Sequence, residues 1–266
     1  MISKVKHIVL EMRLEEVGYT TRGVTSPVLH HVDFTLQAGT FTVVLGQNGS
    51  GKSTLMRCAA GLHTISRGEC LWRGQSPHLI KGEARARLVA YLGQSPTPVF
   101  GFLGREVVQL SRYAFADQHE EKASRMEEAA ACWDVQDLLH RRVDRLSGGE
   151  WQRLALARTW MQDAEILMLD EPTSHLDLAH RLRFFELSRA AARAGKTVLC
   201  ATHDLDPAWE YADRVLVLHG GTLRADGAVQ DVIVESLVRE VFGEVPARLA
   251  NNPQSGRPFW MLGATS

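Results

Sequence analysis

The chain has 266 residues and a formal net charge of −1, a length that suits one large domain or a domain with a subdomain. Its composition, 45% hydrophobic and 23% charged, is that of an ordinary soluble globular protein. The near-zero net charge gives no support for a nucleic-acid partner, and no stretch approaches the roughly 18 uncharged apolar residues of a membrane span.

The cysteines lie far apart and form no CxxC pair, which argues against a disulfide framework or a zinc site and favours a reducing cytosol. The segment Met1 to Leu10 carries charges within an apolar run that is too short for a signal peptide. Any role at a membrane is therefore expected to depend on a partner.

The first predicted elements are strands over Met12 to Tyr19 and Val28 to Leu36, joined by a turn rich in Gly, Thr, Ser and Pro. Apolar and polar residues alternate in the second strand, which is the pattern of a half-buried strand. The pair is expected to form an antiparallel flap beside a nucleotide core. Tyr19, at the tip of the flap, is a candidate to stack on an adenine ring, although packing on its neighbours explains it equally well.

A glycine-rich stretch, Gly46 to Thr54, follows the apolar run Phe41 to Leu45 and precedes a helix-like segment. Glycines allow successive N–H groups to turn inward around an anion, and a helix N-terminus adds free donors. Lys52 is expected to reach the β- and γ-phosphates of a nucleotide, and the Ser53 hydroxyl to ligate Mg²⁺. A glycine loop that binds nothing is the alternative, which the complete motif between strand and helix disfavours. The expected nucleotide-binding residues of this phosphate loop are Gly46, Asn48, Gly49, Ser50, Gly51, Lys52, Ser53 and Thr54.

Gly68 to Gly74 is predicted to form a further strand and turn, and Leu88 to Leu92 a strand that leads to Gln94. The Gln94 amide is a candidate to bind Mg²⁺ and to lie near an attacking water, although a lone glutamine after a strand would mean little by itself. Ser95 to Gly104 is rich in Pro and Gly and is expected to be a loop.

A helical insertion is predicted next, with helices over Arg105 to Ser111 and Glu120 to Trp133, where apolar residues recur every three to four positions. The arginines that follow are interpreted as a solvated face rather than a nucleic-acid patch. These arginines are Arg141, Arg142 and Arg145.

Ser147 is a fitting N-cap for a helix that is expected to run to about Met161. Gly148 and Gly149 would let a phosphate approach the free N–H groups of this helix, which gives a second anion-binding helix terminus. A plain capped helix is the alternative.

A continuous apolar run, Ile166 to Leu169, is predicted to be a buried parallel strand that ends in Asp170 and Glu171. Ligands bind at the C-terminal ends of such strands, so Asp170 is expected to bind Mg²⁺ and Glu171 to orient and deprotonate a water. The alternative is a negative strand end that caps the next helix.

The turn Ser174 to Asp177 leads into a predicted helix over Leu178 to Arg193, and a strand over Lys196 to Thr202 ends at His203. A lone histidine is more often structural, but this one follows a strand at the same sheet edge, which favours a γ-phosphate contact. The remaining elements are predicted to be a hairpin of Arg214 to Leu218 with Thr222 to Arg224, and, from Gln230, one short helix and a tail.

These motifs together resemble the ATP-binding subunits of ABC transporters over roughly Met12 to Arg224. Gly46 to Thr54 matches the phosphate loop, Gln94 the Q-loop and Leu146 to Glu150 the signature. Further matches follow in family order: Ile166 to Glu171 as the second nucleotide motif, Ser174 to Asp177 as the D-loop and His203 as the switch histidine. The chain departs from the usual pattern at Glu150, where glutamine is common, and at His175, where a small residue is common.

The resemblance implies an α/β fold: a P-loop NTPase core with a mostly parallel sheet, an N-terminal antiparallel β flap and a helical insertion. The expected ATPase domain spans residues 12–229, and residues 230–266 form a short C-terminal helix and tail. Within that domain the core would comprise residues 12–95 and 160–229, and the helical subdomain residues 96–159.

A narrower resemblance is to the subunits that serve iron-chelate, haem and cobalamin importers. It rests on Phe102 to Tyr113 and on the ending Val241 to Gly243 with Asn252 to Pro258. The lack of a long C-terminal regulatory domain argues against sugar-type importer subunits. Other transporter classes and a non-transport ABC ATPase remain alternatives, and a P-loop kinase is disfavoured by the signature and by His203.

The resemblance also implies ATP and Mg²⁺ as cofactors and a head-to-tail homodimer in the ATP state. Each nucleotide would contact the phosphate loop of one copy and Ser147, Gly148 and Gly149 of the other, and Asp177 is also implied to contact the nucleotide. The implied partners are two integral-membrane permease subunits and, indirectly, a periplasmic or extracellular substrate-binding protein, with no nucleic acid. The implied location is the cytoplasmic face of the cell (inner) membrane.

Overall fold

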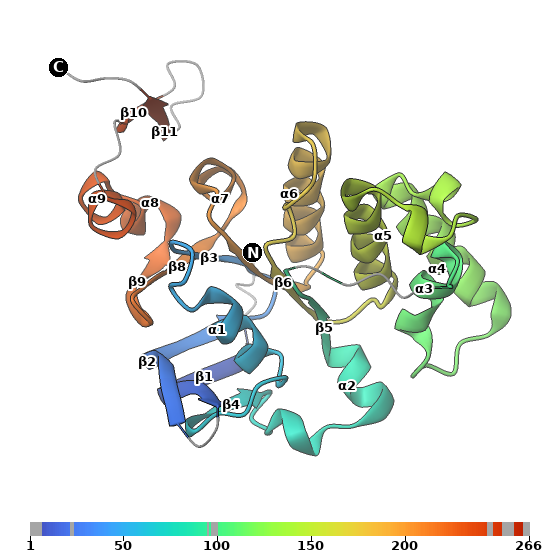
Figure 1. Cartoon of the computed structure of the whole chain (residues 1–266), viewed down its shortest axis with the longest axis horizontal. Coiled ribbons are helices and arrows are strands. Elements are labelled where there is room, and N and C mark those ends of the chain that lie inside the picture. Colours follow the sequence, from blue (N-terminus) through green and yellow to red (C-terminus); the bar gives the residue numbers. More distant parts are fainter. Residues whose placement is uncertain are drawn as a thin grey trace, which may run out of the picture.

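The central element of the computed structural model is a six-stranded sheet with the strand order β5-β6-β7-β3-β8-β9 (Figure 1). The structure describes residues 7–21, 24–94, 96, 101–243, 247–251 and 258–262. Neighbouring strands from β5 to β8 pair in parallel, and β9 pairs with β8 antiparallel, as the predicted hairpin requires. The strands are β3 (Phe41–Leu45), β5 (Val89–Leu92), β6 (Ile166–Asp170), β7 (Thr197–Thr202), β8 (Arg214–His219) and β9 (Thr222–Ala228).

Strands β3, β6 and β7 are buried at every position, which explains their continuous apolar sequences. Alternate residues face opposite sides of the sheet: Phe41, Val43 and Leu45 join one hydrophobic cluster, and Val44 joins the other. Helix α1 (Lys52–Ala59) packs on the second side. Helix α6 (Leu178–Arg193), which has the predicted bounds, packs on the first side through Phe184 and Phe185. The α/β core is therefore confirmed.

A second sheet, of order β2-β1-β4, forms the antiparallel flap. Its strands are β1 (Ile8–Thr21), β2 (Val24–Gln37) and β4 (Arg67–Trp72). The predicted flap is confirmed, but its strands are longer than predicted and most of the predicted turn belongs to them. The reason is the register, which pairs β1 with β2 from Ile8↔Gln37 to Thr21↔Val24, while β4 covers the other edge of β1.

The predicted helical insertion is also present, and its helices lie beside α6 in Figure 1. Helix α2, which lies before Gln94, was not predicted. The helices are α2 (Gly82–Leu88), α3 (Gly104–Gln109), α4 (His119–Trp133) and α5 (Gly148–Met161), and the short 3₁₀ turns are Pro77–Leu79, Leu110–Arg112, Gln136–Leu138 and Val143–Arg145.

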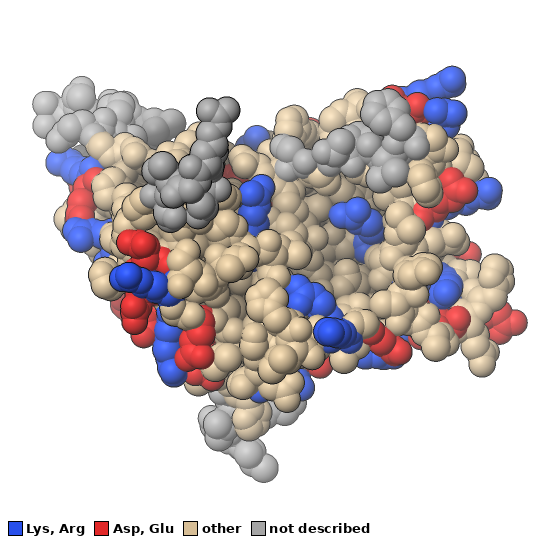
Figure 2. All heavy atoms as spheres, turned by 60° about the horizontal axis from the view of Figure 1, so that its bottom comes forward, with Lys and Arg blue, Asp and Glu red and all other residues tan. Residues whose placement is uncertain are grey.

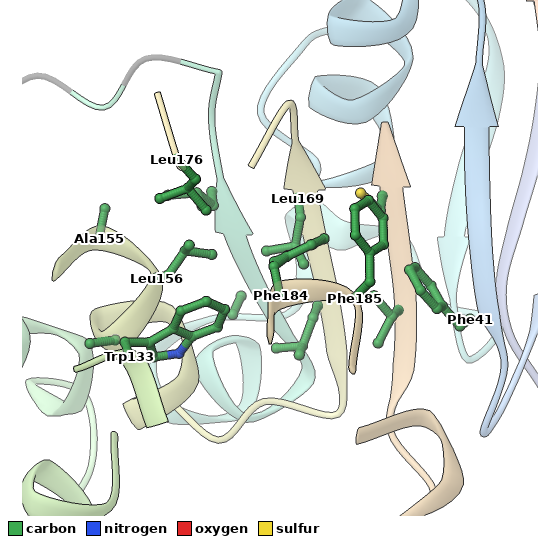
Figure 3. Close-up of a cluster of buried hydrophobic side chains, with 14 of the residues drawn as sticks. Phe41, Trp133, Ala155, Leu156, Leu169, Leu176, Phe184 and Phe185 are labelled. Carbon is green, nitrogen blue, oxygen red and sulfur yellow. The ribbon is translucent and has the colours of Figure 1, made fainter. Parts of the chain in front are cut away.

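Aromatic side chains join the insertion to the core (Figure 3). Trp133 of α4 packs edge-on against Trp160 of α5, with ring centroids 4.8 Å apart, and also lies against Phe184 of α6. Phe184 packs against Phe185 at 5.0 Å. One hydrophobic cluster thus runs from the insertion to the sheet. The division of the ATPase domain into residues 12–95 and 160–229 with a subdomain of residues 96–159 stays a prediction.

The C-terminal part differs from the predicted single helix and tail. Two helices are present because buried Val229, Val232, Val238 and Val241 pack on the core cluster, and α9 ends at Gly243, whose φ is 86°. A strand pair follows, with Ala247 opposite Leu262. The C-terminal elements are α8 (Val229–Val232), α9 (Glu235–Phe242), β10 (Ala247–Asn251) and β11 (Pro258–Leu262). Helix α7 (Leu205–Tyr211), between β7 and β8, was not predicted.

All four cysteines are free, as the spacing predicts. Within the described ranges, no helix combines the length and apolar character that crossing a membrane requires.

Candidate active site

The candidate site lies where β3, β5 and β6 end, at one edge of the central sheet. A cavity of about 250 Å³ opens there, beside the N-terminus of α1. The structure brings together most of the residues predicted from the phosphate loop and from the strand ends. The cavity is lined by Tyr19, Val28, Asn48, Gly49, Gly51, Lys52, Ser53, Thr54, Gln94 and Glu171.

The phosphate loop has the backbone that an anion nest needs. Gly49 and Gly51 have φ values of 81° and 103°, which lie in a backbone region that residues other than glycine rarely adopt. A Cβ on Gly46 would lie 2.3 Å from the Leu218 carbonyl oxygen, so this glycine is required by close packing. The Ser50 Oγ is buried and has no hydrogen-bond partner among the described residues.

Lys52 is buried beneath the loop, with only 6% of its surface exposed. Its ammonium group donates to the carbonyl oxygens of Gly46 at 2.8 Å and Gln47 at 3.1 Å. The Glu171 carboxylate lies 3.5 Å from the same ammonium group. The cation thus lies beside the cavity at the position from which it can reach the phosphates of a nucleotide.

Asp170, at the end of β6, has the features of a cation ligand. It is 1% exposed, and within the described part of the chain neither carboxylate oxygen has a hydrogen-bond partner. Burial raises the pKa of this carboxyl and the nearby Glu171 charge adds to the shift, while the Ser53 hydroxyl and the charges of Arg57 and Lys52 offset it only in part. Ser53 and Gln94 supply hydroxyl and amide oxygens at the neighbouring cavity. This oxygen donor set fits Mg²⁺.

We expect Asp170→Asn to raise the free energy of unfolding at pH 7 by about 1–2 kcal/mol, because it removes an uncompensated buried charge. The folded-state pKa is raised, so the carboxylate destabilises the fold above that pKa and the gain disappears as the pH falls below about 4. Urea unfolding without nucleotide or metal at both pH values measures this. The same variant is expected to lose ATPase activity.

Asp117→Asn is a control that is expected to change the free energy of unfolding in the opposite direction. The hydrogen bonds from Arg112 lower the pKa of the buried Asp117 carboxyl. Removal of that charge is therefore expected to destabilise the fold at pH 7. An Asp170→Asn protein less stable than wild type at pH 7 would contradict the assignment.

Glu171 and His203 meet at the same edge, from β6 and β7 respectively. Glu171 is 4% exposed, and its φ of 50° is unusual for a residue other than glycine. Its Oε2 lies 2.9 Å from the His203 Nδ1, whereas its Oε1 faces Lys52. Such a carboxylate, fixed by a cation and an imidazole at the cavity wall, is placed to orient a water and accept its proton. His203 keeps 61% of its side chain exposed, so it can also contact a ligand.

Tyr19 has features of both roles that the sequence leaves open, which are packing on its neighbours and stacking on an adenine ring. Its ring packs against His63 with centroids 4.7 Å apart, and its hydroxyl lies 3.3 Å from the Thr54 Oγ1. The side chain nevertheless lines the cavity and is 39% exposed. The contact with adenine stays a prediction.

Ser147, Gly148 and Gly149 lie elsewhere: none of them lines the cavity, and α5 is separated from α1 in Figure 1. Ser147 caps α5 in a capping box, in which its Oγ accepts from the Glu150 N–H at 3.3 Å. Ser147 is exposed, so this helix terminus is accessible to a ligand from outside the chain.

Asp177 and His175 also lie apart from the cavity. The Asp177 carboxylate caps α6 by accepting from the His180 N–H at 2.9 Å. His175 has a φ of 68° and lies against the signature glycines: a Cβ on Gly149 would be 2.9 Å from its carbonyl oxygen. The contact of Asp177 with a nucleotide stays a prediction.

Comparison with known proteins decides the family. A family model described as ABC transporter matches residues 29–174. Achromobactin transport ATP-binding protein CbrD of Dickeya dadantii (strain 3937) is 36% identical over 242 residues, covering 89% of this chain and 88% of that protein. The chain belongs to the ABC transporter family. Hemin import ATP-binding protein HmuV of Plesiomonas shigelloides is 35% identical over 248 residues, covering 86% of this chain and 94% of the relative.

Solved structures of ABC proteins share the fold. A metal-chelate type ABC transporter in an inward-facing conformation matches with a TM-score of 0.76 at 22% identity, covering 96% of this chain and 97% of that one. A dimeric ATP-binding cassette bound to ADP and Pi matches with a TM-score of 0.75 at 23% identity, covering 83% and 98%. With this fold and family, the chain is an ABC ATPase.

The structure of this ABC ATPase also shows positioning residues that the sequence analysis missed. Trp151 of α5 donates its Nε1–H to the carbonyl oxygen of Pro96, just after Gln94. Gln152 donates to the Pro172 carbonyl oxygen at 2.8 Å, next to Glu171. Helix α5 therefore contacts both segments that carry the candidate residues Gln94 and Glu171. Little in the sequence indicates these contacts, because an aromatic residue and a polar residue such as Trp151 and Gln152 are ordinary at helix positions.

Proposed function

We propose that this chain is the ATP-hydrolysing subunit that energises an ABC importer for an iron chelate, haem or cobalamin-type cargo. The observation that carries the proposal is the group of relatives named for achromobactin transport and hemin import, which match most of the chain at 35–36% identity. Its site has the lysine, carboxylates and histidine of ATP hydrolysis at one sheet edge.

The proposed reaction depends on these side chains and on Mg²⁺. Ser53, Gln94 and Asp170 would hold the metal, which neutralises charge on the β- and γ-phosphates. Lys52 binds the phosphates, Glu171 accepts the proton of the attacking water, and His203 contacts the γ-phosphate and orients Glu171.

We further propose that the ATP state is a head-to-tail homodimer. The signature residues of the same chain do not line the cavity, so one side of a bound triphosphate would face water, while the α5 terminus at Ser147 is accessible elsewhere. A second copy would bring its Ser147, Gly148 and Gly149 against the γ-phosphate, and hydrolysis would remove the charge that joins the copies. This arrangement makes each site incomplete without the partner copy.

The membrane partners we propose are two permease subunits, which receive the cargo from a periplasmic or extracellular binding protein. A groove of about 450 Å³ between α3 and α4 is suited to a permease segment. Its lining combines apolar side chains, among them Tyr113 at 88% and Leu110 at 48% exposed, with the polar Glu106, Gln109, His119 and Lys122. We expect Gln94 and the loop Ser95 to Gly104 to carry the coupling; Ser95 and residues 97–100 of this loop lie outside the described residues. This docking would place the subunit at the cytoplasmic face of the inner membrane.

We expect the double variant Leu110→Ala, Tyr113→Ala to lower ATP-driven transport at least tenfold, because it truncates apolar anchors of the permease contact. The ATPase rate of the isolated subunit is expected to stay within twofold of wild type, because neither residue lines the ATP cavity. Uptake by reconstituted proteoliposomes and phosphate release measure the two effects. Leu79→Ala is the control, since Leu79 is 78% exposed outside this groove. Normal transport by the double variant would exclude the groove as the docking site.

The alternatives are an ABC ATPase of another transporter class and, with less support, a non-transport ABC ATPase. Positive and negative side chains lie side by side toward the left and right of the face in Figure 2, and the formal net charge of −1 favours a partner other than nucleic acid. Purification from cells with bound membrane subunits, rather than nucleic acid, decides between transport and non-transport roles. Uptake of a ferric siderophore, haem and cobalamin by the reconstituted complex then decides the cargo; no uptake of any of them would reject the importer class.

A further inference from the structure

The signature terminus of α5 carries a negative charge next to Ser147. The Glu150 Oε2 accepts hydrogen bonds from the Ser147 backbone N–H at 2.8 Å and from the Ser147 Oγ at 2.9 Å. These bonds, the backbone one first, lower the pKa of Glu150 to about 2. Glu150 is therefore ionised at neutral pH.

This charge conflicts with the contact that the proposed dimer requires. The Ser147 hydroxyl has one proton, and here it points at Glu150. To bind a γ-phosphate from the partner copy, the hydroxyl must turn away from Glu150, and two like charges must come close together. A glutamine at this position would cap the helix without that repulsion.

Arg141 lies on the opposite side of the same carboxylate. Its Nη1 is 2.5 Å from the Glu150 Oε1, the oxygen that does not contact Ser147. Its Nη2 contacts the Arg145 carbonyl oxygen at 3.4 Å, which helps to fix the guanidinium group. The neighbouring Arg142 pairs instead with Asp144, at 2.8 Å. Arg141 thus compensates the one carboxylate that faces the signature serine.

We propose that Arg141 is a positioning residue for the shared ATP site. Its positive charge offsets the Glu150 carboxylate beside Ser147, which lowers the repulsion of the partner copy's γ-phosphate and lets the serine hydroxyl turn from Glu150 toward it. This inference rests on the head-to-tail dimer proposed above.

The test measures ATP-dependent dimerisation in the slow Glu171→Gln background by sedimentation equilibrium. Arg141→Ala is expected to weaken the contact between the signature residues and ATP about threefold at each shared site, as the loss of an exposed ion pair would. Because a symmetric dimer has two such sites, the dimer affinity is expected to fall about tenfold. The effect is expected to shrink at 0.5 M salt. Arg141→Lys, which keeps the charge, is expected to retain most of the dimer affinity.

Two further variants separate positioning from a structural role. Arg142→Ala is the matched control, because Arg142 is 47% and Arg141 45% exposed and each has its own carboxylate partner. With Glu150→Gln also present, Arg141→Ala is expected to have no effect, because there is no charge left to compensate.

The outcomes distinguish the inference from the dimer itself. A Glu171→Gln protein that stays monomeric in ATP overturns the shared site and this inference with it. If the Glu171→Gln protein dimerises and adding Arg141→Ala does not weaken that dimer, the inference is overturned but the shared site is not. An equal weakening of the dimer by Arg141→Ala in the Glu150→Gln background also overturns the inference and leaves the shared site standing.

Discussion

Glu171→Gln is expected to lower the ATPase rate by about a hundred- to ten-thousand-fold, because glutamine keeps the size of the side chain but cannot accept the proton of the attacking water. ATP binding is expected to survive, since it depends on Lys52, Ser53 and the loop N–H groups. Single-turnover phosphate release and equilibrium binding of a fluorescent ATP analogue measure the two quantities.

The same variant tests the dimer. Because ATP persists in the site and is bound by both copies, mass action stabilises the closed form. Light scattering after size-exclusion chromatography should find a dimer in ATP and a monomer in ADP. Adding Ser147→Arg should abolish this dimer, because the larger side chain separates the signature helix from the phosphate.

Glu165→Gln is the matched control for the loss of a carboxylate. Glu165 directly precedes β6, pairs with Arg73 at the surface and lies outside the cavity lining. Its substitution should leave the rate unchanged. A near-normal rate for Glu171→Gln would remove the assignment of the base, and a monomer in ATP would overturn the shared site.

Lys52→Ala is expected to lower kcat/KM for ATP by about three orders of magnitude or more. The lysine is a charged donor to the phosphates, and loss of one such contact in a preorganised site typically costs about a hundred- to a thousandfold in rate, in addition to weaker binding. Steady-state kinetics with nucleotide titration measures both parts. Lys196→Ala is a control, because that lysine pairs with Asp163 outside the cavity.

The contact between Lys52 and Glu171 adds a second expectation. Both groups are almost fully buried, so Lys52→Ala leaves Glu171 without its cation and should destabilise the nucleotide-free fold by about 1–3 kcal/mol. The double variant Lys52→Ala, Glu171→Gln should recover part of that stability without recovering activity. Wild-type-like turnover by Lys52→Ala would contradict the phosphate-loop assignment.

Local patterns were sufficient to predict most of the fold. The bounds of α6 matched the prediction because Asp177 caps its start and Gly195 follows its end. The bounds of β6 and β7 followed from apolar runs buried on both faces. By contrast, the ends of β1 and the flap position of β4 depend on register with distant segments, which no local window contains. Helices α8 and α9 are short, and their burial depends on the core cluster.

The candidate site likewise has residues that the sequence predicts and contacts that it does not. The sequence predicted the residues that motifs mark, including Lys52, Asp170 and Glu171. It did not predict that Glu171 joins Lys52 to His203, or that Trp151 contacts the Pro96 carbonyl group. These contacts depend on the relative placement of strand ends and of α5, which tertiary packing sets.

The position of β3 in the sheet has a consequence for biosynthesis. Among the described residues, the strand that leads into the phosphate loop pairs with β7 and β8 alone, and both are made long after it. Closing such long loops is entropically costly, so these pairings are expected late in folding. A nascent chain that ends before Thr197 therefore carries the whole glycine motif without either strand that supports it. Acquisition of ATP binding thus reports completion of the central sheet, and ATP in the cell would stabilise only chains that extend through β8.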